Sequence, residues 1–185
     1  MKFNKLQSLE FSKPLENEIV LLLPLQNKDF EDLFLVASDK EIWVQHPQND
    51  RWKKEIFRDY FESAIQSNSA YLIKEKINNE IIGCTRFYNY TPSTSIHIGY
   101  TFLAKKYWGG KYNLSVKSLM INFAFKNLNS IFFDVGSLNI RSRKAVEKIG
   151  ATLFNEDLVK NKCTYKLDKT KWLNKKISEN NSEIS

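Results

Sequence analysis

The period of the hydrophobic pattern changes along this 185-residue chain, and these changes limit the folds that it can adopt. Apolar and polar residues alternate over 70–76, 81–90 and 95–103, which is typical of half-buried strands. The short turns INNE and TPST join the three segments, so we expect antiparallel neighbours. Over 112–128 apolar residues recur every three or four positions, which predicts a helix buried on more than half of its surface.

Strand and helix patterns also flank this central part. Before it we expect a strand at 18–24, a helix at 28–37 capped by Asn27, and a second helix capped by Asp50. After it we expect a strand at 131–136, a helix at 139–150 capped by Asn139 and closed by Gly150, and two further strands at ATLFNED and CTYKLD. This order predicts an α+β fold in three layers, with a mostly antiparallel central sheet flanked by helices. A βαβ crossover is expected around the helix at 112–128.

The length of the chain suits one sizeable core, so we expect a single domain over residues 1–185. Its core is expected at about 15–172, followed by a polar and flexible tail at 173–185. The longest aliphatic run, IVLLLPL at 19–25, is far shorter than the roughly 18 residues that span a bilayer, so no membrane contact is expected. The N-terminus lacks the pattern of a secretion signal, and we therefore expect a cytoplasmic location.

The two cysteines, Cys84 and Cys163, each lie in an apolar or strand-like segment. This placement predicts reduced, buried thiols rather than a disulfide framework. Zinc needs more ligands than the chain clusters in sequence, so no metal cofactor is expected.

The net charge of +7 is unevenly distributed. Residues 1–104 hold 12 Lys and Arg against 14 Asp and Glu, whereas residues 105–176 hold 16 against 5. The basic half permits an anionic partner, although a chain rich in Lys and Asn supplies part of the excess by composition alone. A nucleic acid is the less expected partner, because the lysines lack the regular aromatic interleaving of a base-stacking platform.

The basic half begins at YWGGKYN, residues 107–113, where a strand is expected to feed a helix. The first N–H groups of a helix are unpaired and lie at its positive end, so such a turn can hold an anion. Glycine allows close approach because it has no Cβ. Lys105, Lys106 and Lys111 add charge beside it. By itself, the turn fits either a plain tight turn or an anion cradle.

Three motifs, taken in their order along the chain, favour the anion cradle over the plain turn. They are Ile98, Gly99 and Tyr100; Tyr107, Trp108, Gly109, Gly110, Lys111 and Tyr112; and Asn139, Ser142, Glu147, Lys148 and Gly150. In this order they resemble the GNAT N-acetyltransferase superfamily, and most of all the branch that includes the ribosomal-protein N-terminal acetyltransferases. The likeness covers roughly residues 15–172. The family pattern has G-K-G where this chain has G-G-K, so the amides that would contact phosphate stay open.

The resemblance implies acetyl-CoA as cosubstrate, with its pyrophosphate at 106–113 and its pantetheine arm beside 98–103. The implied contacts are Gly99, Tyr100, Thr101, Phe102, Trp108, Gly109, Gly110, Lys111, Tyr112, Asn113, Asn139, Ser142 and Arg143. Arg141 and Lys144 are further candidates for the outer phosphates, and a solvated polar face is the alternative for each of these basic residues.

The resemblance also implies the groups that move protons. His97 stands where the family often has a base, two residues before the glycine of I-G-Y, and imidazole titrates near neutrality. Asp134 is the rival base, a water chain is a third possibility, and Tyr88 and Glu80 are more remote.

The family's usual tyrosine in the last helix is absent. Val146 replaces it, so Ser142 is the candidate donor to the departing thiol. The residues expected to line an acceptor pocket are Trp43, His46, Arg86 and Tyr88.

We therefore predict an N-acetyltransferase that moves an acetyl group directly from acetyl-CoA to a primary amine, on a protein N-terminus or a small molecule. The alternatives are an acyl-CoA-binding module without catalysis and, less favoured, a basic nucleic-acid-binding domain. The acidic balance of residues 1–104 favours a cationic acceptor. A monomer and a homodimer are equally compatible with the sequence.

Overall fold

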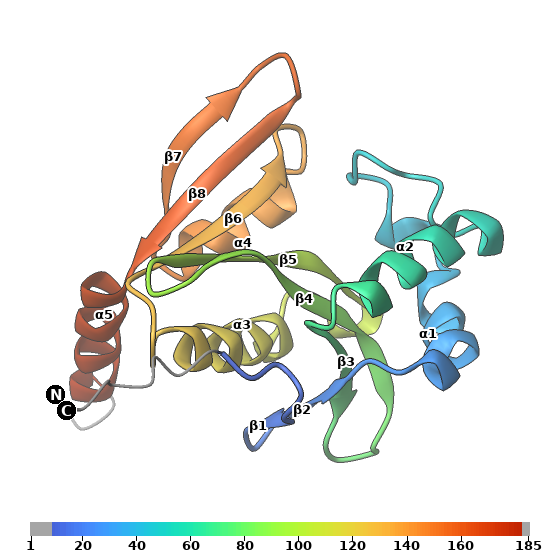
Figure 1. Cartoon of the computed structure of the whole chain (residues 1–185), viewed down its shortest axis with the longest axis horizontal. Helices are drawn as coiled ribbons and strands as arrows, with labels where there is room; N and C mark the ends of the chain where they lie inside the picture. The colour runs from blue at the N-terminus through green and yellow to red at the C-terminus, as the bar shows by residue number, and fades with distance from the viewer. Residues whose placement is uncertain (1–8, 183–185) are drawn as a thin grey trace, which may run out of the picture.

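The structure is a computed structural model that describes residues 9–182 and has the predicted α+β architecture (Figure 1). The strands are β1 (Leu15–Glu16), β2 (Val20–Pro24), β3 (Ala70–Glu75), β4 (Ile81–Thr91), β5 (Ser95–Leu103), β6 (Ser130–Gly136), β7 (Thr152–Asp157) and β8 (Lys162–Asp168). The α-helices are α1 (Phe30–Ala37), α2 (Lys54–Gln66), α3 (Lys111–Ala124), α4 (Ile140–Lys148) and α5 (Lys169–Ser182).

The strands form one sheet in the order β1-β2-β3-β4-β5-β6-β8-β7. Strands β3, β4 and β5 are antiparallel neighbours, as predicted from their turns. The pair β5 and β6 is parallel, and α3 makes the crossover between them. The predicted mostly antiparallel sheet with one βαβ crossover is therefore confirmed.

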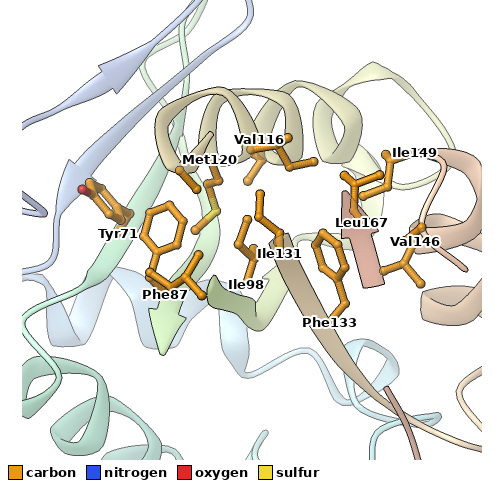
Figure 2. Packing of buried hydrophobic residues seen from close by; sticks show 14 of the residues in the cluster. Tyr71, Phe87, Ile98, Val116, Met120, Ile131, Phe133, Val146, Ile149 and Leu167 are labelled. Atoms are coloured by element: carbon orange, nitrogen blue, oxygen red, sulfur yellow. The ribbon is translucent and has the colours of Figure 1, made fainter. Parts of the chain in front are cut away.

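Helices cover both faces of the sheet, and each face has its own apolar cluster. On one face, Val116 and Met120 of α3 reach down to Ile98 and Ile131 of the sheet, as Figure 2 shows. Val146 of α4 belongs to the same cluster. On the other face, α1 and α2 pack their aromatic residues against Leu72, Cys84 and Phe102. The helices and sheet thus make the expected three layers.

The structure differs from the sequence-based expectation at three helix ends. A short 3-10 turn occupies 27–29, so α1 begins at Phe30, and Asn27 does not cap it. Asp50 does not cap α2, which begins four residues later because residues 50–53 form a turn.

The third difference is at the C-terminus, where α5 occupies 169–182 and the polar composition predicted a flexible tail from 173. Trp172 anchors this helix: its side chain is 3% exposed, and its Nε1 donates to Asn122 Oδ1 at 2.9 Å.

Within residues 9–182, no helix has the length and apolar character needed to cross a membrane.

Pairing between β5 and β6 ends early. Only three residue pairs join the strands, from Ser95 with Ser130 to His97 with Phe132. Strand β5 continues to Leu103 and β6 to Gly136, and their ribbons diverge (Figure 1). Beyond His97, the edge of β5 that faces β6 is therefore not paired in the sheet, and a wedge opens between the two strands.

Replacing Trp172 by Ala should destabilise the protein by about 3–5 kcal/mol, because it removes a large buried side chain. Urea unfolding followed by circular dichroism measures this change. The matched control is Leu173→Ala, since Leu173 is 47% exposed and should change stability by less than about 0.5 kcal/mol. Equal stability of the two variants would show that α5 is not anchored by Trp172.

Candidate active site

A cavity of about 760 Å³ lies at the wedge between β5 and β6. The predicted site residues that line it are Trp43, His46, Tyr88, Gly99, Tyr100, Thr101, Phe102, Trp108, Gly109, Gly110, Asn113, Asp134, Asn139 and Ser142. The predicted residues outside its lining are Arg86, His97, Lys111, Tyr112 and Arg143. The fold thus brings most of the predicted residues, from distant parts of the sequence, to one opening.

The glycine turn forms one end of the cavity. Gly109 has φ +70°, a left-handed conformation that favours glycine, and Gly110 is the residue before the first turn of α3. No side chain caps this helix end. A Cβ built on either glycine would meet no atom within 4 Å, so the backbone faces open space. The uncapped N-terminus of α3 therefore faces open space, and the N–H groups at such a helix end can bind an anion.

A bulge in β5 shapes the middle of the cavity. Gly99 pairs with Arg86 and Phe102 with Cys84, so the two residues between Gly99 and Phe102 oppose one residue of β4. Tyr100 consequently has φ +51° and is 39% exposed. A Cβ on Gly99 would lie 2.9 Å from Tyr88 Cε1, so only glycine lets the Tyr88 ring cross the strand here.

Asp134 of β6 is the centre of a polar cluster. Its Oδ1 accepts from Thr164 Oγ1 at 2.6 Å, and its Oδ2 accepts from Tyr88 Oη at 3.3 Å. His97 Nδ1 and Lys162 Nζ lie 3.3 and 3.6 Å from Oδ2. The His97 contact has an ion-pair distance but not the alignment of a good hydrogen bond, since Nδ1 is otherwise buried without a partner among the described residues.

These contacts fix the charge of the cluster. Burial alone would raise the pKa of Asp134, but the close contact and charge of His97, the hydrogen bond from Thr164 and the charge of Lys162 hold it well below its usual range. The Tyr88 pKa is raised far above its usual value by burial and by the Asp134 charge, so the phenol stays protonated. Asp134 is thus an ionised carboxylate that faces the cavity.

Helix α4 closes another side of the cavity. Asn139 caps it as predicted, with Oδ1 accepting from Ser142 N at 3.1 Å. The Ser142 side chain lines the cavity, and no group within residues 9–182 hydrogen-bonds its hydroxyl. Arg143 points elsewhere: its Nε donates to Tyr165 Oη at 2.9 Å and its Nη1 to the Ser137 carbonyl at 3.2 Å. The guanidinium of Arg143 therefore fastens α4 to β8 and does not line the cavity.

The segment between α1 and α2 covers the cavity on the other face of the sheet. Trp43 is only 2% exposed and donates from Nε1 to the Ala37 carbonyl at 2.7 Å, which ties the segment to the end of α1. Pro47 lies so close to the end of β6 that a Cβ on Gly136 would be 2.9 Å from its Cγ. His46 and Arg51 line the cavity from this segment.

The family model described as "Acetyltransferase (GNAT) domain" matches residues 20–152 of the chain. The chain belongs to the GNAT acetyltransferase family. The family implies an acyltransferase that uses acetyl-CoA, as the sequence motifs predicted. No curated protein matches the chain in sequence.

Solved structures with the same fold have low sequence identity to this GNAT chain. A GCN5-related N-acetyltransferase from Brucella melitensis superposes with a TM-score of 0.76 at 16% identity, over 89% of this chain and 82% of the other. Ribosomal-protein-S5-alanine acetyltransferase from Vibrio fischeri gives 0.62 at 18% identity, over 86% and 98%. Mycobacterium smegmatis RimJ in complex with CoA-disulfide gives 0.62 at 14% identity, over 85% and 87%. At these identities, the likeness shows the fold alone.

Lys117 of α3 is a cavity residue of this GNAT chain that the sequence reading missed. It is 6% exposed, and its Nζ donates to Thr101 Oγ1 at 2.7 Å without a carboxylate partner among residues 9–182. Burial lowers its pKa to about 7. A signal was present, because Lys117 interrupts the apolar stripe of Leu114 and Ile121 on the predicted helix. Within residues 9–182, no three His, Cys, Asp or Glu side chains cluster to hold a metal ion.

Lys117→Met should stabilise the free protein by roughly 2–4 kcal/mol at pH 6.5, because it removes a buried ammonium without a counterion. The folded protein binds fewer protons than the unfolded chain between pH 7 and 10.5, so the penalty is complete below about pH 7 and declines as the pH rises. The stability of the wild type should therefore approach that of the variant by about pH 9.5. Urea unfolding across this range measures both.

The control for this substitution is Lys126→Met, which changes an exposed lysine just after the same helix. Its pH dependence should follow that of the wild type. A constant difference between Lys117→Met and wild type from pH 6.5 to 9.5 would contradict a depressed Lys117 pKa.

Proposed function

We propose that this GNAT protein transfers the acetyl group of acetyl-CoA directly to a primary amine, on a small molecule or a protein N-terminus. Its main support is the glycine turn, which leaves the uncapped N-terminus of α3 open to the cavity beside the unpaired edge of β5. A cytoplasmic location and a monomeric or homodimeric state stay predictions from the sequence.

The cavity offers a place for each part of the cosubstrate. The pyrophosphate would accept hydrogen bonds from the backbone of Gly110 and the first turn of α3. The amides of the pantetheine arm would pair with the free edge of β5 after His97, as an added strand would. Arg141, whose guanidinium lies 3.8 Å from the ring centre of Trp108, supplies positive charge beside the turn. Acetyl-CoA brings an already activated thioester, so the protein needs mainly to orient the reactants and move one proton.

In the proposed reaction, the amine nitrogen bonds to the acetyl carbon, the carbon–sulfur bond breaks, and the electron pair leaves with the CoA sulfur. The ionised Asp134 attracts the amine to the cavity, and the proton lost by nitrogen ends on the His97–Asp134 pair. Tyr88 stays protonated and holds the carboxylate in place. The Ser142 hydroxyl, which is free of other partners among the described residues, would donate to the departing sulfur.

Gly110→Val should weaken acetyl-CoA binding by roughly 10-fold or more while the stability of the free protein stays unchanged. Gly110 has an extended backbone, with φ −104° and ψ −155°, that valine also adopts, and its side chain would extend into the open space of the cradle. Thermal unfolding with and without acetyl-CoA measures both quantities, since a ligand raises the melting temperature according to its affinity.

The smaller change Gly110→Ala should give an intermediate loss. If wild type shows no shift at millimolar acetyl-CoA, the proposed function is wrong. If Gly110→Val binds acetyl-CoA as the wild type does, the phosphate site is elsewhere.

Asp134→Asn should lower kcat by roughly 100-fold or more, because it removes the negative charge that supports proton transfer. The acetyl-CoA-induced rise in melting temperature should persist, since Asp134 lies on the acceptor side of the wedge. The pH–rate profile should show no loss attributable to Asp134 protonation above about pH 4, because its pKa is held below its usual range.

The matched control is Asp168→Asn at the far end of the β6–β8 pair, where Asp168 bonds Ser130 and not the cavity. Release of CoA thiol with a panel of amines gives the rates. An Asp134→Asn variant as active as Asp168→Asn would remove the carboxylate from the mechanism.

A further inference from the structure

Two arginines are buried without a counterion: Arg51 lines the cavity, and Arg86 lies outside the lining, with its guanidinium 3.4 Å from the ring centre of Tyr100. Arg51 is 7% exposed and Arg86 is 6% exposed. Within residues 9–182, neither forms an ion pair with a carboxylate. Arg86 donates to Ser63 Oγ at 3.0 Å, while its Nε has no partner in the same range. Buried guanidinium groups without an anion are unfavourable, so Arg51, which lines the cavity, suits a ligand that brings one.

Arg51 and His46 together form a pair of converging donors. Burial and the Arg51 charge lower the His46 pKa to about 4, so the ring is neutral at pH 7. His46 Nδ1 accepts from Gln48 N at 3.0 Å, and the neutral ring therefore carries its proton on Nε2. That Nε2 lies 3.2 Å from Arg51 Nη1, which is also a donor. Two N–H groups this close cannot hydrogen-bond each other, and one oxyanion beside them, within reach of both nitrogens, would satisfy both.

The position of this donor pair relative to Asp134 follows from a row of aromatic rings. The Arg51 guanidinium lies 4.8 Å from the ring centre of Tyr60, whose hydroxyl donates to the Tyr100 carbonyl at 2.6 Å. The Tyr100 ring is 5.1 Å from that of Tyr88, which bonds Asp134. Contacts through Tyr60, Tyr100 and Tyr88 thus connect the donor pair to the carboxylate that would receive the amine. The donor pair, that carboxylate and the exposed Tyr100 ring all line one cavity.

The charges around the cavity agree with an anionic ligand. Its lining has Asp134 as the single carboxylate among the described residues, against seven basic side chains: Arg51, Lys117, Arg141, Lys144, Lys148, Lys160 and Lys162. The lining is thus basic, whereas residues 1–104 as a whole have a small excess of acidic residues. The sequence-based expectation of a cationic acceptor rests on that acidic excess. The phosphates of CoA have their own cradle at Gly109 and Gly110, so Arg51 and His46 stay available for the acceptor.

We propose that the acceptor is a primary amine that also carries an oxyanion, a carboxylate or a phosphate, held by Arg51 and His46 while its amine lies beside Asp134. The inference rests on the proposed acetyl transfer and specifies the substrate class of that site.

The test compares acceptors in matched sets: amino alcohols of increasing chain length, amino carboxylates of the same lengths, and phosphate monoesters of the same alcohols. Release of CoA thiol by the full chain gives kcat/KM. Wild type should favour the anionic member of at least one set by roughly 10-fold or more, and the better of the carboxylate and phosphate arms identifies the oxyanion. Arg51→Met should abolish this preference by lowering kcat/KM for the anionic acceptors roughly 10-fold or more relative to their neutral partners.

Three variants and a second measurement keep the result interpretable. Arg58→Met is the control, because Arg58 is an exposed arginine of α2 that stacks on Phe30 outside the cavity. His46→Gln tests the second donor if Arg51→Met does not fold. Arg51→Met should also be at least as stable as wild type without ligand. If Arg51 had a purely structural role, its removal would instead lower the stability of the protein. Calorimetric binding of the anionic acceptors in the presence of CoA reads the site without catalysis.

Wild-type preference for neutral or cationic acceptors would overturn the inference while acetyl transfer itself stands. A loss of acetyl-CoA affinity in Arg51→Met would assign the donors to the cosubstrate and also overturn it. If acetyl-CoA binds but no amine is acetylated, the proposed function fails, and the calorimetry then decides the inference. Binding of an anionic amine that depends on Arg51 supports the site, and its absence refutes it.

Discussion

The structure depends on one interruption of hydrogen bonding, the end of pairing between β5 and β6 after His97 and Phe132. If two parallel strands separated without other support, their backbone N–H and C=O groups would lack hydrogen-bond partners. Here the apolar residues beneath them, Ile98 and Phe133, stay packed against α3 and α4, so the strands diverge above a continuous core. The wedge, the free edge of β5 and the position of the glycine turn all follow from this interruption.

The cavity at the wedge concentrates groups that the folded chain alone does not satisfy. Lys117 is buried with a hydroxyl as its partner, and Arg51 shares its space with another donor. Each lowers the stability of the free protein, since a buried charge without a counterion is unfavourable. Unsatisfied groups that line one cavity indicate a site whose polar balance is completed by ligands, which we propose to be acetyl-CoA and an acceptor that carries an oxyanion.

The polar cluster on β6 shows why a list of candidate bases was insufficient. From the sequence, His97 and Asp134 were rivals, because each was a plausible proton acceptor by itself. The sheet places them on neighbouring strands and on the same face, with their side chains 3.3 Å apart. Asp134 faces the cavity and His97 lies behind it, so the two are better described as one pair than as alternatives.

The sequence by itself determined the strands and helices from residue 18 to 168 in outline, the glycine turn and the family resemblance, because hydrophobic period, helix caps and local motifs depend on near neighbours along the chain. Asn139 as a cap and Gly109 and Gly110 at the head of α3 are such cases. The α5 helix was missed because its stability comes from Trp172 packing on a distant helix, and local composition alone gave a tail. Lys117 and Arg51 became site residues only through the tertiary structure, which places both in the lining of the cavity. Their roles depend on burial and on partners dozens of residues away. Neither can be predicted from the sequence, where each lysine and arginine is expected to be solvated.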